Sequence, residues 1–173
     1  MSGISRSVLA GFFGLLATAA MADAPTLIGS FKDWSAFQTS ASGRKVCFAM
    51  AKPSAMEPKK AKRDPAYFMI SDWPARKIKG ELQIMPGYQY KDGALVTATV
   101  GADKFDFFSK NEGGQGKAWV EDQDQEKRVL EAMKGGARLV VTGTSLRGTN
   151  TKDTYALGGL SDALQKVHEA CAM

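Results

Sequence analysis

Histidine and cysteine are scarce in this sequence: His168 is the only histidine, and Cys47 and Cys171 are the only cysteines. Any histidine-dependent triad or acid–base scheme would have to use His168, and no G-x-S-x-G motif accompanies it. One histidine and two cysteines are also too few soft ligands, at the wrong spacings, for a structural zinc site. We therefore expect no catalytic residue, cofactor or metal. We interpret His168 as a surface histidine near a helix end, where its positive charge favours the helix dipole.

Long apolar runs are absent except near the N-terminus. Residues 8–17 form an apolar stretch behind Arg6, and the A-x-A motif Ala20-Met21-Ala22 follows. This order is typical of a secretory signal peptide, and it predicts a signal peptide over 1–22 and a single β-rich domain over 23–173. The apolar stretch is too short to span a bilayer. We expect a protein that does not span the membrane and is periplasmic, with secretion or attachment to the outer membrane as alternatives.

Strong charge of one sign is also missing. The formal net charge of +5 favours solubility and weak attraction to anionic surfaces, but it does not by itself make a nucleic-acid binder. The densest basic run lies between Pro58 and Pro65, which predicts a loop. No aromatic residue is interleaved with it, which argues against single-stranded nucleic-acid recognition. The run could contact lipopolysaccharide, a membrane surface or an acidic partner, and the alternative is a solvated loop. Its candidate anion-binding residues are Lys59, Lys60, Lys62 and Arg63.

Short β-like segments separated by turn residues make up most of the remaining chain. The segment 45–51 places alternate residues on two faces that are both poor in charge, as expected inside a layered core. The segment 67–70 is expected to stop before Asp72 and Pro74. Regular spacing of such segments favours a mainly β fold, an antiparallel β-sandwich or a barrel-like domain. The predicted strands are 31–38, 45–51, 67–70, 81–85, 94–100, 104–108, 117–120, 138–146 and 154–157.

Two helices are predicted within this β pattern. The internal helix has Asp122 as its N-cap candidate, Gln125 three residues later and a Gly-Gly pair at 135–136 that ends it. The second helix runs over about 161–171 with Ser161 as its cap candidate. Four of its apolar residues recur at helical spacing and form one stripe, so this C-terminal helix should pack on the sheet with Cys171 toward the core. The stripe consists of Leu160, Leu164, Val167 and Cys171.

The two cysteines are predicted to form a disulfide. A terminal helix laid against a sheet could bring Cys171 onto the strand that carries Cys47, and such a bond persists in the oxidising environment that an exported protein meets. The alternative is two unpaired buried thiols.

Short motifs along nearly the whole mature chain resemble the invasion-associated locus B family, a group of small exported proteins of alphaproteobacteria. These motifs are GSFKDW at 29–34, VCFAM at 46–50, LGGLSDAL at 157–164 and HEAC at 168–171. The resemblance implies a mainly β, non-enzymatic protein that is associated with the envelope or secreted and binds a partner. That partner would be an envelope or host protein, or an anionic surface. Many members carry another cysteine shortly after the Asp-Trp pair, where this sequence has Ser-Ala-Phe at 35–37.

Two other functional classes stay open beside this binding protein. A periplasmic inhibitor or small-ligand carrier would look the same in sequence, and a pocket would distinguish it. A hydrolase would have to use carboxylates such as Asp33, Asp64 or Asp72, although no spacing ties any two of them to one site. Gly113-Gly114 is expected to form a hairpin turn, because the P-loop spacing fails at 111 and 118.

Overall fold

The structure, a computed structural model, describes residues 24–173. The predicted signal peptide, 1–22, and the predicted first residue of the mature chain, Asp23, lie outside the described residues. Within them the chain forms eleven strands, two α-helices and one 3-10 turn. The strands are β1 (Thr26–Phe31), β2 (Trp34–Ala41), β3 (Arg44–Ala51), β4 (Ala55–Glu57), β5 (Tyr67–Trp73), β6 (Ile78–Met85), β7 (Val96–Val100), β8 (Asp103–Glu112), β9 (Gln115–Trp119), β10 (Arg138–Thr144) and β11 (Asn150–Ala156). The helices are α1 (Gln123–Gly135) and α2 (Leu160–Cys171), and η1 (Pro74–Arg76) is the 3-10 turn.

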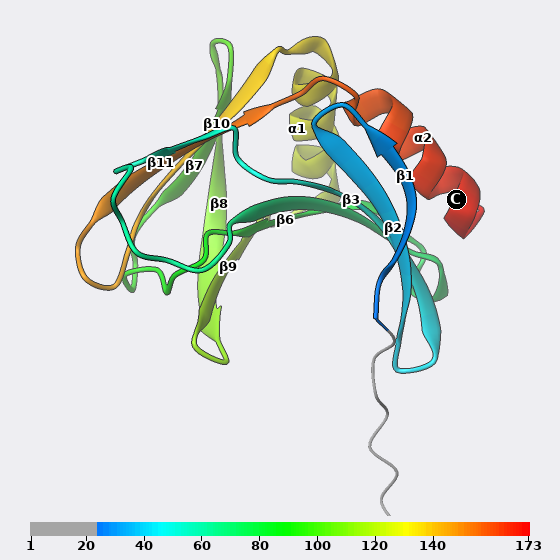
Figure 1. Cartoon of the computed structure of the whole chain (residues 1–173), viewed down its shortest axis with the longest axis horizontal. Helices are drawn as coiled ribbons and strands as arrows, with labels where there is room; N and C mark the ends of the chain where they lie inside the picture. The colour runs from blue at the N-terminus through cyan, green and yellow to red at the C-terminus, as the bar shows by residue number, and fades with distance from the viewer. Residues whose placement is uncertain (1–23) are drawn as a thin grey trace, which may run out of the picture.

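All eleven strands belong to one antiparallel sheet, in the order β1-β2-β3-β5-β6-β9-β8-β7-β10-β11-β4. This sheet curls so that its two halves face each other (Figure 1). Five strands lie between β5, which carries Phe68, and β11, which carries Tyr155, in the sheet order, yet the two ring centroids are 5.8 Å apart. The indole of Trp34 on β2 donates a hydrogen bond of 3.0 Å to the carbonyl of Ala156 at the end of β11. The mainly β, antiparallel fold predicted from the sequence is confirmed.

The long strand β8 joins the two halves. Its first half, up to Phe107, pairs with β7, and its second half, from Phe108, pairs with β9. Phe105 and Phe107 point into the core, whereas Phe108 lies on the other face, 45% exposed, and stacks on Trp119. The Gly113-Gly114 turn between β8 and β9 has positive φ at both residues, which glycine adopts without strain.

Both helices were predicted, and their apolar sides pack as expected. The side chain of Asp122 accepts a hydrogen bond of 2.7 Å from the backbone N–H of Gln125, so the predicted N-cap of α1 is confirmed. Helix α2 lies on β1, β2, β3 and β5 and buries its predicted apolar stripe. It begins one residue earlier than predicted, and Gly159 in left-handed conformation, not Ser161, occupies the N-cap position. Neither helix of the described range is long and apolar enough to cross a membrane.

Three strand predictions were wrong in detail. The predicted strand 31–38 is two strands, because the chain turns at Lys32, whose φ is 52°. Strand β5 does not stop before Asp72 but continues to Trp73, because Asp72 faces a hydrogen-bonding partner described below. The short edge strand β4 was missed, since its three exposed residues carry no alternating pattern.

Candidate functional site: a basic pocket and the helix that closes the other end

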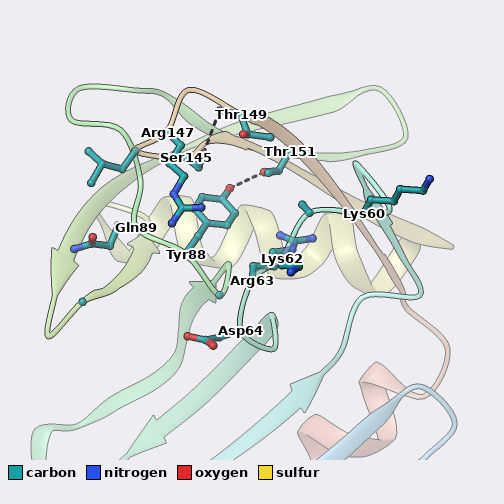
Figure 2. Close-up of a pocket in the computed structure, with 14 residues that line it drawn as sticks. Lys60, Lys62, Arg63, Asp64, Tyr88, Gln89, Ser145, Arg147, Thr149 and Thr151 are labelled. Atoms are coloured by element: carbon teal, nitrogen blue, oxygen red, sulfur yellow. Dashed lines mark hydrogen bonds between the residues drawn. The ribbon is translucent and has the colours of Figure 1, made fainter.

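A pocket of about 650 Å³ lies where four connecting segments meet (Figure 2). The segments are the loop that follows β4, the stretch between β6 and β7, the turn between β8 and β9, and the turn between β10 and β11. These segments lie away from α2 in Figure 1. Three exposed cations line it: Lys60, Lys62 and Arg147. Asp64 is the one carboxylate of the lining, and its side chain accepts a hydrogen bond of 2.7 Å from Gln115. The pocket therefore carries an excess of positive charge.

Residues 58–66, between β4 and β5, form the basic loop. Arg63 holds this loop against the rest of the domain. Its guanidinium donates two hydrogen bonds to the carboxylate of Asp153 on β11 and one of 3.1 Å to the carbonyl of Pro86. The two charged side chains are only 5% and 4% exposed. Burial lowers the pKa of Arg63, but the hydrogen bonds and negative charge of Asp153 outweigh this effect, so the pKa is raised. Arg63 is thus a structural anchor whose charge is compensated within the protein.

Tyr88 forms part of the pocket wall. Its hydroxyl lies 2.5 Å from the Thr151 hydroxyl, which donates to the carbonyl of Gly143 at 3.2 Å. The guanidinium carbon of Arg63 lies 5.7 Å from the centroid of the Tyr88 ring, a cation–π geometry. Burial raises the pKa of Tyr88 above its ordinary value, so the phenol stays protonated to a higher pH than a free tyrosine. The ring is therefore fixed by contacts at its hydroxyl and on one face.

Gly87 allows the basic loop to approach the stretch between β6 and β7. Its φ is +76°, and a Cβ there would lie 1.9 Å from the backbone oxygen of Asp64. The backbone N–H of Asp64 donates a hydrogen bond of 2.9 Å to the Gly87 carbonyl. Any larger residue at 87 would push the basic loop away from the stretch between β6 and β7.

Two tyrosine hydroxyls lie buried beneath the pocket. The side-chain oxygens of Tyr90 and Tyr155 have no hydrogen-bond partner within residues 24–173. Burial raises the pKa of both phenols, and the charge of Asp153 adds to this effect. These hydroxyls, the Arg63–Asp153 pair and Tyr88 together make a polar region inside an otherwise apolar core.

The predicted anion-binding residues divide into two groups. Lys60 and Lys62 line the pocket as free cations, and Lys59 is exposed on the same loop outside the lining. Arg63 is not an accessible cation, because Asp153 takes up its charge. Arg147 was missed by the sequence analysis. It stands alone in a turn far along the chain from the basic run, and only the paired strands β10 and β11 bring that turn to the loop.

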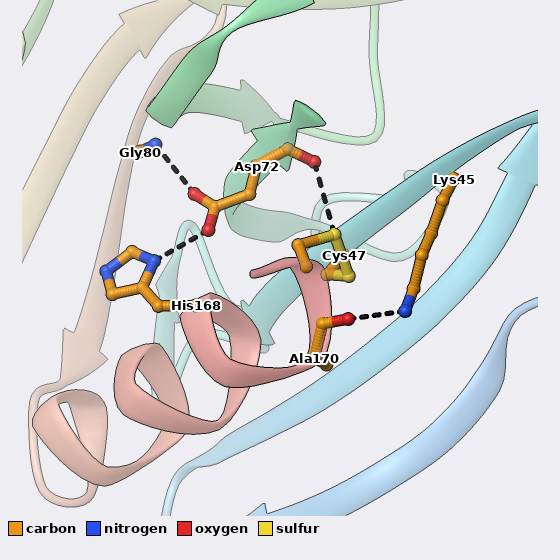
Figure 3. The surroundings of a disulfide bond; sticks show 7 residues. Lys45, Cys47, Asp72, Gly80, His168 and Ala170 are labelled. Carbon is orange, nitrogen blue, oxygen red and sulfur yellow. Dashed lines mark hydrogen bonds and ion pairs between the residues drawn. A yellow bond between two sulfur atoms is a disulfide. The ribbon is translucent and has the colours of Figure 1, made fainter. Parts of the chain in front are cut away.

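The opposite end of the molecule is closed by α2 (Figure 3). The structure joins Cys47 on β3 to Cys171 on α2 in the predicted disulfide, with a Cα–Cα distance of 5.9 Å. The Cys171 sulfur lies 4.0 Å from the carbonyl oxygen of Asp72, which is a contact and not a hydrogen bond, because a disulfide sulfur carries no proton. The Lys45 ammonium donates to the carbonyl of Ala170 near the helix C-terminus. A covalent bond and a charged hydrogen bond thus fix the last turn of α2.

His168 lies in the last turn of α2, near a helix end as predicted, but its side chain is also paired with a buried carboxylate. Its Nδ1 lies 2.6 Å from one carboxylate oxygen of Asp72, and the other oxygen accepts a hydrogen bond of 2.9 Å from the backbone N–H of Gly80. Asp72 is fully buried, whereas the His168 side chain is 27% exposed. The sequence could not reveal this pair, because its members are 96 residues apart. Their contact explains the position of His168 better than the helix dipole alone.

The Asp72–His168 pair invites a comparison with hydrolase triads, which need a nucleophile within hydrogen-bond reach of the histidine. Ser161 lines the same shallow hollow as His168, but it precedes His168 by seven positions in the helix, which is about 10 Å along the axis. The backbone N–H of Asp33 donates to the Gly158 carbonyl at 3.2 Å, and the carboxylate of Asp64 accepts a hydrogen bond from Gln115, so neither residue joins the Asp72–His168 pair. Within residues 24–173, no group of three or more His, Cys, Asp or Glu side chains is placed to hold a metal ion.

Fold and site together define the class: a small antiparallel β domain, closed by a disulfide to its C-terminal helix, with a basic pocket built from loops. The model of the invasion associated locus B (IalB) family matches residues 34–168, so the chain belongs to this family, as the sequence motifs predicted.

A solved structure shares the fold. The crystal structure of invasion associated protein B from Bartonella henselae superimposes with a TM-score of 0.56 and 16% sequence identity, covering 84% of this chain and 98% of that chain. No curated protein sequence matches this one.

Proposed function

We propose that this IalB-family chain is an exported, non-enzymatic protein that binds a partner at the cell envelope through its basic pocket. The observation that carries this proposal is the uncompensated positive charge of the pocket. Lys60, Lys62 and Arg147 make no ion pair within the described residues, while Asp64 is engaged by Gln115. Cations that the fold leaves unpaired at a concave site are a means of attracting a negatively charged partner.

A binding role is also consistent with the position of His168. The histidine belongs to α2 and is hydrogen-bonded to buried Asp72, and the pocket lining contains neither residue. The pocket itself contains cations, hydroxyl groups and a tyrosine ring. Such groups orient and hold an anion without any step of covalent chemistry.

A small-ligand carrier or inhibitor of the periplasm is the second candidate. The observation in its favour is the volume of the pocket, about 650 Å³, which is in the range of small-molecule sites.

Affinity capture from a cell-envelope extract tests the proposal. The mature protein is compared with a pocket variant, Lys60→Gln/Lys62→Gln/Arg147→Gln, and with a matched control that removes three exposed cations elsewhere, Arg44→Gln/Lys79→Gln/Lys104→Gln. We expect one partner to be retained by the mature protein and the control but lost by the pocket variant. A small molecule that copurifies, detected by mass spectrometry, would favour the carrier. Equal capture by all three proteins would refute the pocket as the binding site.

Export is tested separately by cell fractionation and N-terminal sequencing. We expect the protein in the periplasmic or outer fraction with Asp23 as its first residue. A full-length chain in the cytoplasm would contradict the proposed location.

A further inference from the structure

We infer that the ligand of the basic pocket is an anionic saccharide, a sugar that carries phosphate or carboxylate groups. This inference rests on the proposed function, because it takes the pocket as the binding site and names the chemistry that the site selects.

The negative charge of the ligand follows from the pocket rim. The three cations, which have no ion pair within residues 24–173, come from two segments: Lys60 and Lys62 from the basic loop and Arg147 from the β10–β11 turn. Figure 2 shows Lys62 and Arg147 on different sides of Tyr88, with Lys60 extending outward at the edge of the pocket. A guanidinium can engage phosphate or carboxylate with two parallel hydrogen bonds. The neighbouring Arg63–Asp153 pair adds no net charge. The rim therefore suits an anionic group that is held by several cations at once.

Hydroxyl and amide groups supply the polar contacts that a sugar needs. The side chains of Thr149 and Gln89 line the pocket and form no hydrogen bond within the described part of the chain. Ser145 accepts a hydrogen bond from the backbone of Thr149, which leaves its own hydroxyl proton available. Neutral hydrogen-bond donors and acceptors beside cations suit a ligand that carries hydroxyl groups as well as an anionic group.

An apolar surface completes the site. Tyr88 is a fixed ring in the wall, and Leu146, which is 55% exposed, stands in the turn beside it. A sugar ring has one face of C–H groups that can pack against such a surface while its hydroxyls face polar side chains. An inorganic anion would leave both residues unused.

An acidic peptide fits this site less well than a sugar. Peptides often bind by adding a strand to free backbone groups, but the turn uses its own backbone. The N–H of Ser145 donates to the Thr149 carbonyl, that of Gly148 to the Ser145 carbonyl, and that of Leu146 to the Gln89 carbonyl. The pocket thus offers side chains and not a sheet edge.

Binding of defined probes, followed by ¹⁵N NMR of the mature protein, tests the inference. The probes are glucose 1-phosphate, glucuronic acid, glucose, inorganic phosphate and a hexaglutamate peptide. We expect the two anionic sugars to shift the amide signals of Tyr88 and Arg147 and to bind about tenfold more tightly than glucose or inorganic phosphate, a difference of about 1.4 kcal/mol. The pocket variant should lose this binding, and the matched control should keep it.

Several outcomes would overturn the inference. If glucose binds as tightly as glucose 1-phosphate, the negative charge is not needed for binding. If inorganic phosphate does so, the sugar is not needed. Tighter binding of hexaglutamate would identify a peptide site, and the absence of any shift at Tyr88 and Arg147 would exclude the pocket. If the pocket variant still loses the envelope partner while no sugar binds, the saccharide inference fails and the proposed function stands.

A vesicle sedimentation experiment distinguishes a membrane glycolipid from a free glycan as the source of the saccharide. If the protein sediments with vesicles that contain lipopolysaccharide and glucose 1-phosphate releases it, the ligand is a membrane glycolipid. If it binds the soluble sugar phosphate but not the vesicles, the ligand is a free glycan. Either result supports an anionic saccharide.

Discussion

The two ends of the molecule use polar groups in opposite ways. At the α2 end, the carboxylate of Asp72 has hydrogen-bond partners on both oxygens, and Cys47 and Cys171 are joined covalently. At the pocket end, Arg63 and Asp153 also satisfy each other's charge, but the cations at the rim of the pocket have no ion-pair partner among residues 24–173. Fully paired groups stabilise a structure, whereas unpaired charges at the surface contribute little to stability and stay available for a ligand. The comparison separates the residues that hold this fold from those that are free to bind.

Both ends tie together segments that are distant in sequence. The disulfide spans 124 residues, and Arg63 and Asp153 are 90 residues apart. Since the ties differ in kind, their removal should have effects of different sizes.

Removing the disulfide should cost the most. In Cys47→Ala/Cys171→Ala, the free energy of unfolding should fall by about 3–5 kcal/mol, because the bond restricts a long loop of the unfolded chain. Urea denaturation measures this loss. Binding at the distant pocket should persist under conditions in which the variant is folded. Unchanged stability would show that the apolar face of α2 alone holds the helix.

Breaking the buried ion pair should be almost as costly at the other end. Asp153→Asn leaves the Arg63 charge buried without compensation, so we expect a loss of about 3 kcal/mol. The double variant Arg63→Met/Asp153→Leu is the control, because it removes both charges and should recover much of this loss. If the double variant loses as much free energy of unfolding as Arg63→Met and Asp153→Leu lose together, the pair acts through packing and not through charge.

Alkaline pH should destabilise the pocket end through its buried tyrosines. The pKa values of Tyr90 and Tyr155 are raised in the folded protein by burial, so the stability they contribute is complete below the ordinary tyrosine pKa of about 10 and is lost as pH rises above it. At pH 11 we expect a loss of about 2–3 kcal/mol for the two residues together. Urea midpoints between pH 8 and pH 11 measure it. The variant Tyr90→Phe/Tyr155→Phe should lose clearly less, and an identical profile would contradict this explanation.

Removing the histidine partner of Asp72 should have a moderate effect. His168→Ala leaves one oxygen of a buried carboxylate without its hydrogen bond, which we expect to cost about 1–2 kcal/mol. His168→Asn can place an amide N–H near the position of Nδ1 and should recover part of that stability. Thermal unfolding compares the two variants. Equal losses for alanine and asparagine would assign the effect to packing.

Neutralising the pocket cations should change stability least. For Lys60→Gln/Lys62→Gln/Arg147→Gln we expect a change within about 0.5 kcal/mol, as for other exposed side chains. Urea denaturation of this variant beside the matched control makes the measurement. A loss above about 1 kcal/mol would mean that these cations have structural partners and would weaken the distinction between the two ends.

Local patterns predicted much of the fold. The Asp122 cap, the Gly-Gly end of α1 and the apolar stripe of α2 are short-range features, and alternation located nine of the strands at least in part. The two errors at the ends of elements have different causes, one local and one tertiary. A left-handed residue at Lys32 is not evident from its side chain, and Asp72 looked like a strand breaker because its partner lies on another element.

The candidate site could be predicted only in part. The basic run between two prolines identified Lys60 and Lys62, because charge density is visible along the chain. It also suggested Arg63, which the fold instead buries against Asp153. Arg147 and Tyr88 carry no motif, and their role depends on the turn and the loop that the curled sheet brings together.

The sequence alone was enough to predict the antiparallel β fold, its two helices and its family, because periodicity, capping residues and short motifs act over a few neighbouring positions. The disulfide was predicted because the sequence has only two cysteines and one of them lies on the apolar stripe of the terminal helix. The tertiary structure alone decided which polar groups are paired and which are free. Charges such as those of Arg63 and Lys62 are alike in sequence, and only the position of a partner across the fold makes one an anchor and leaves the other open to a ligand.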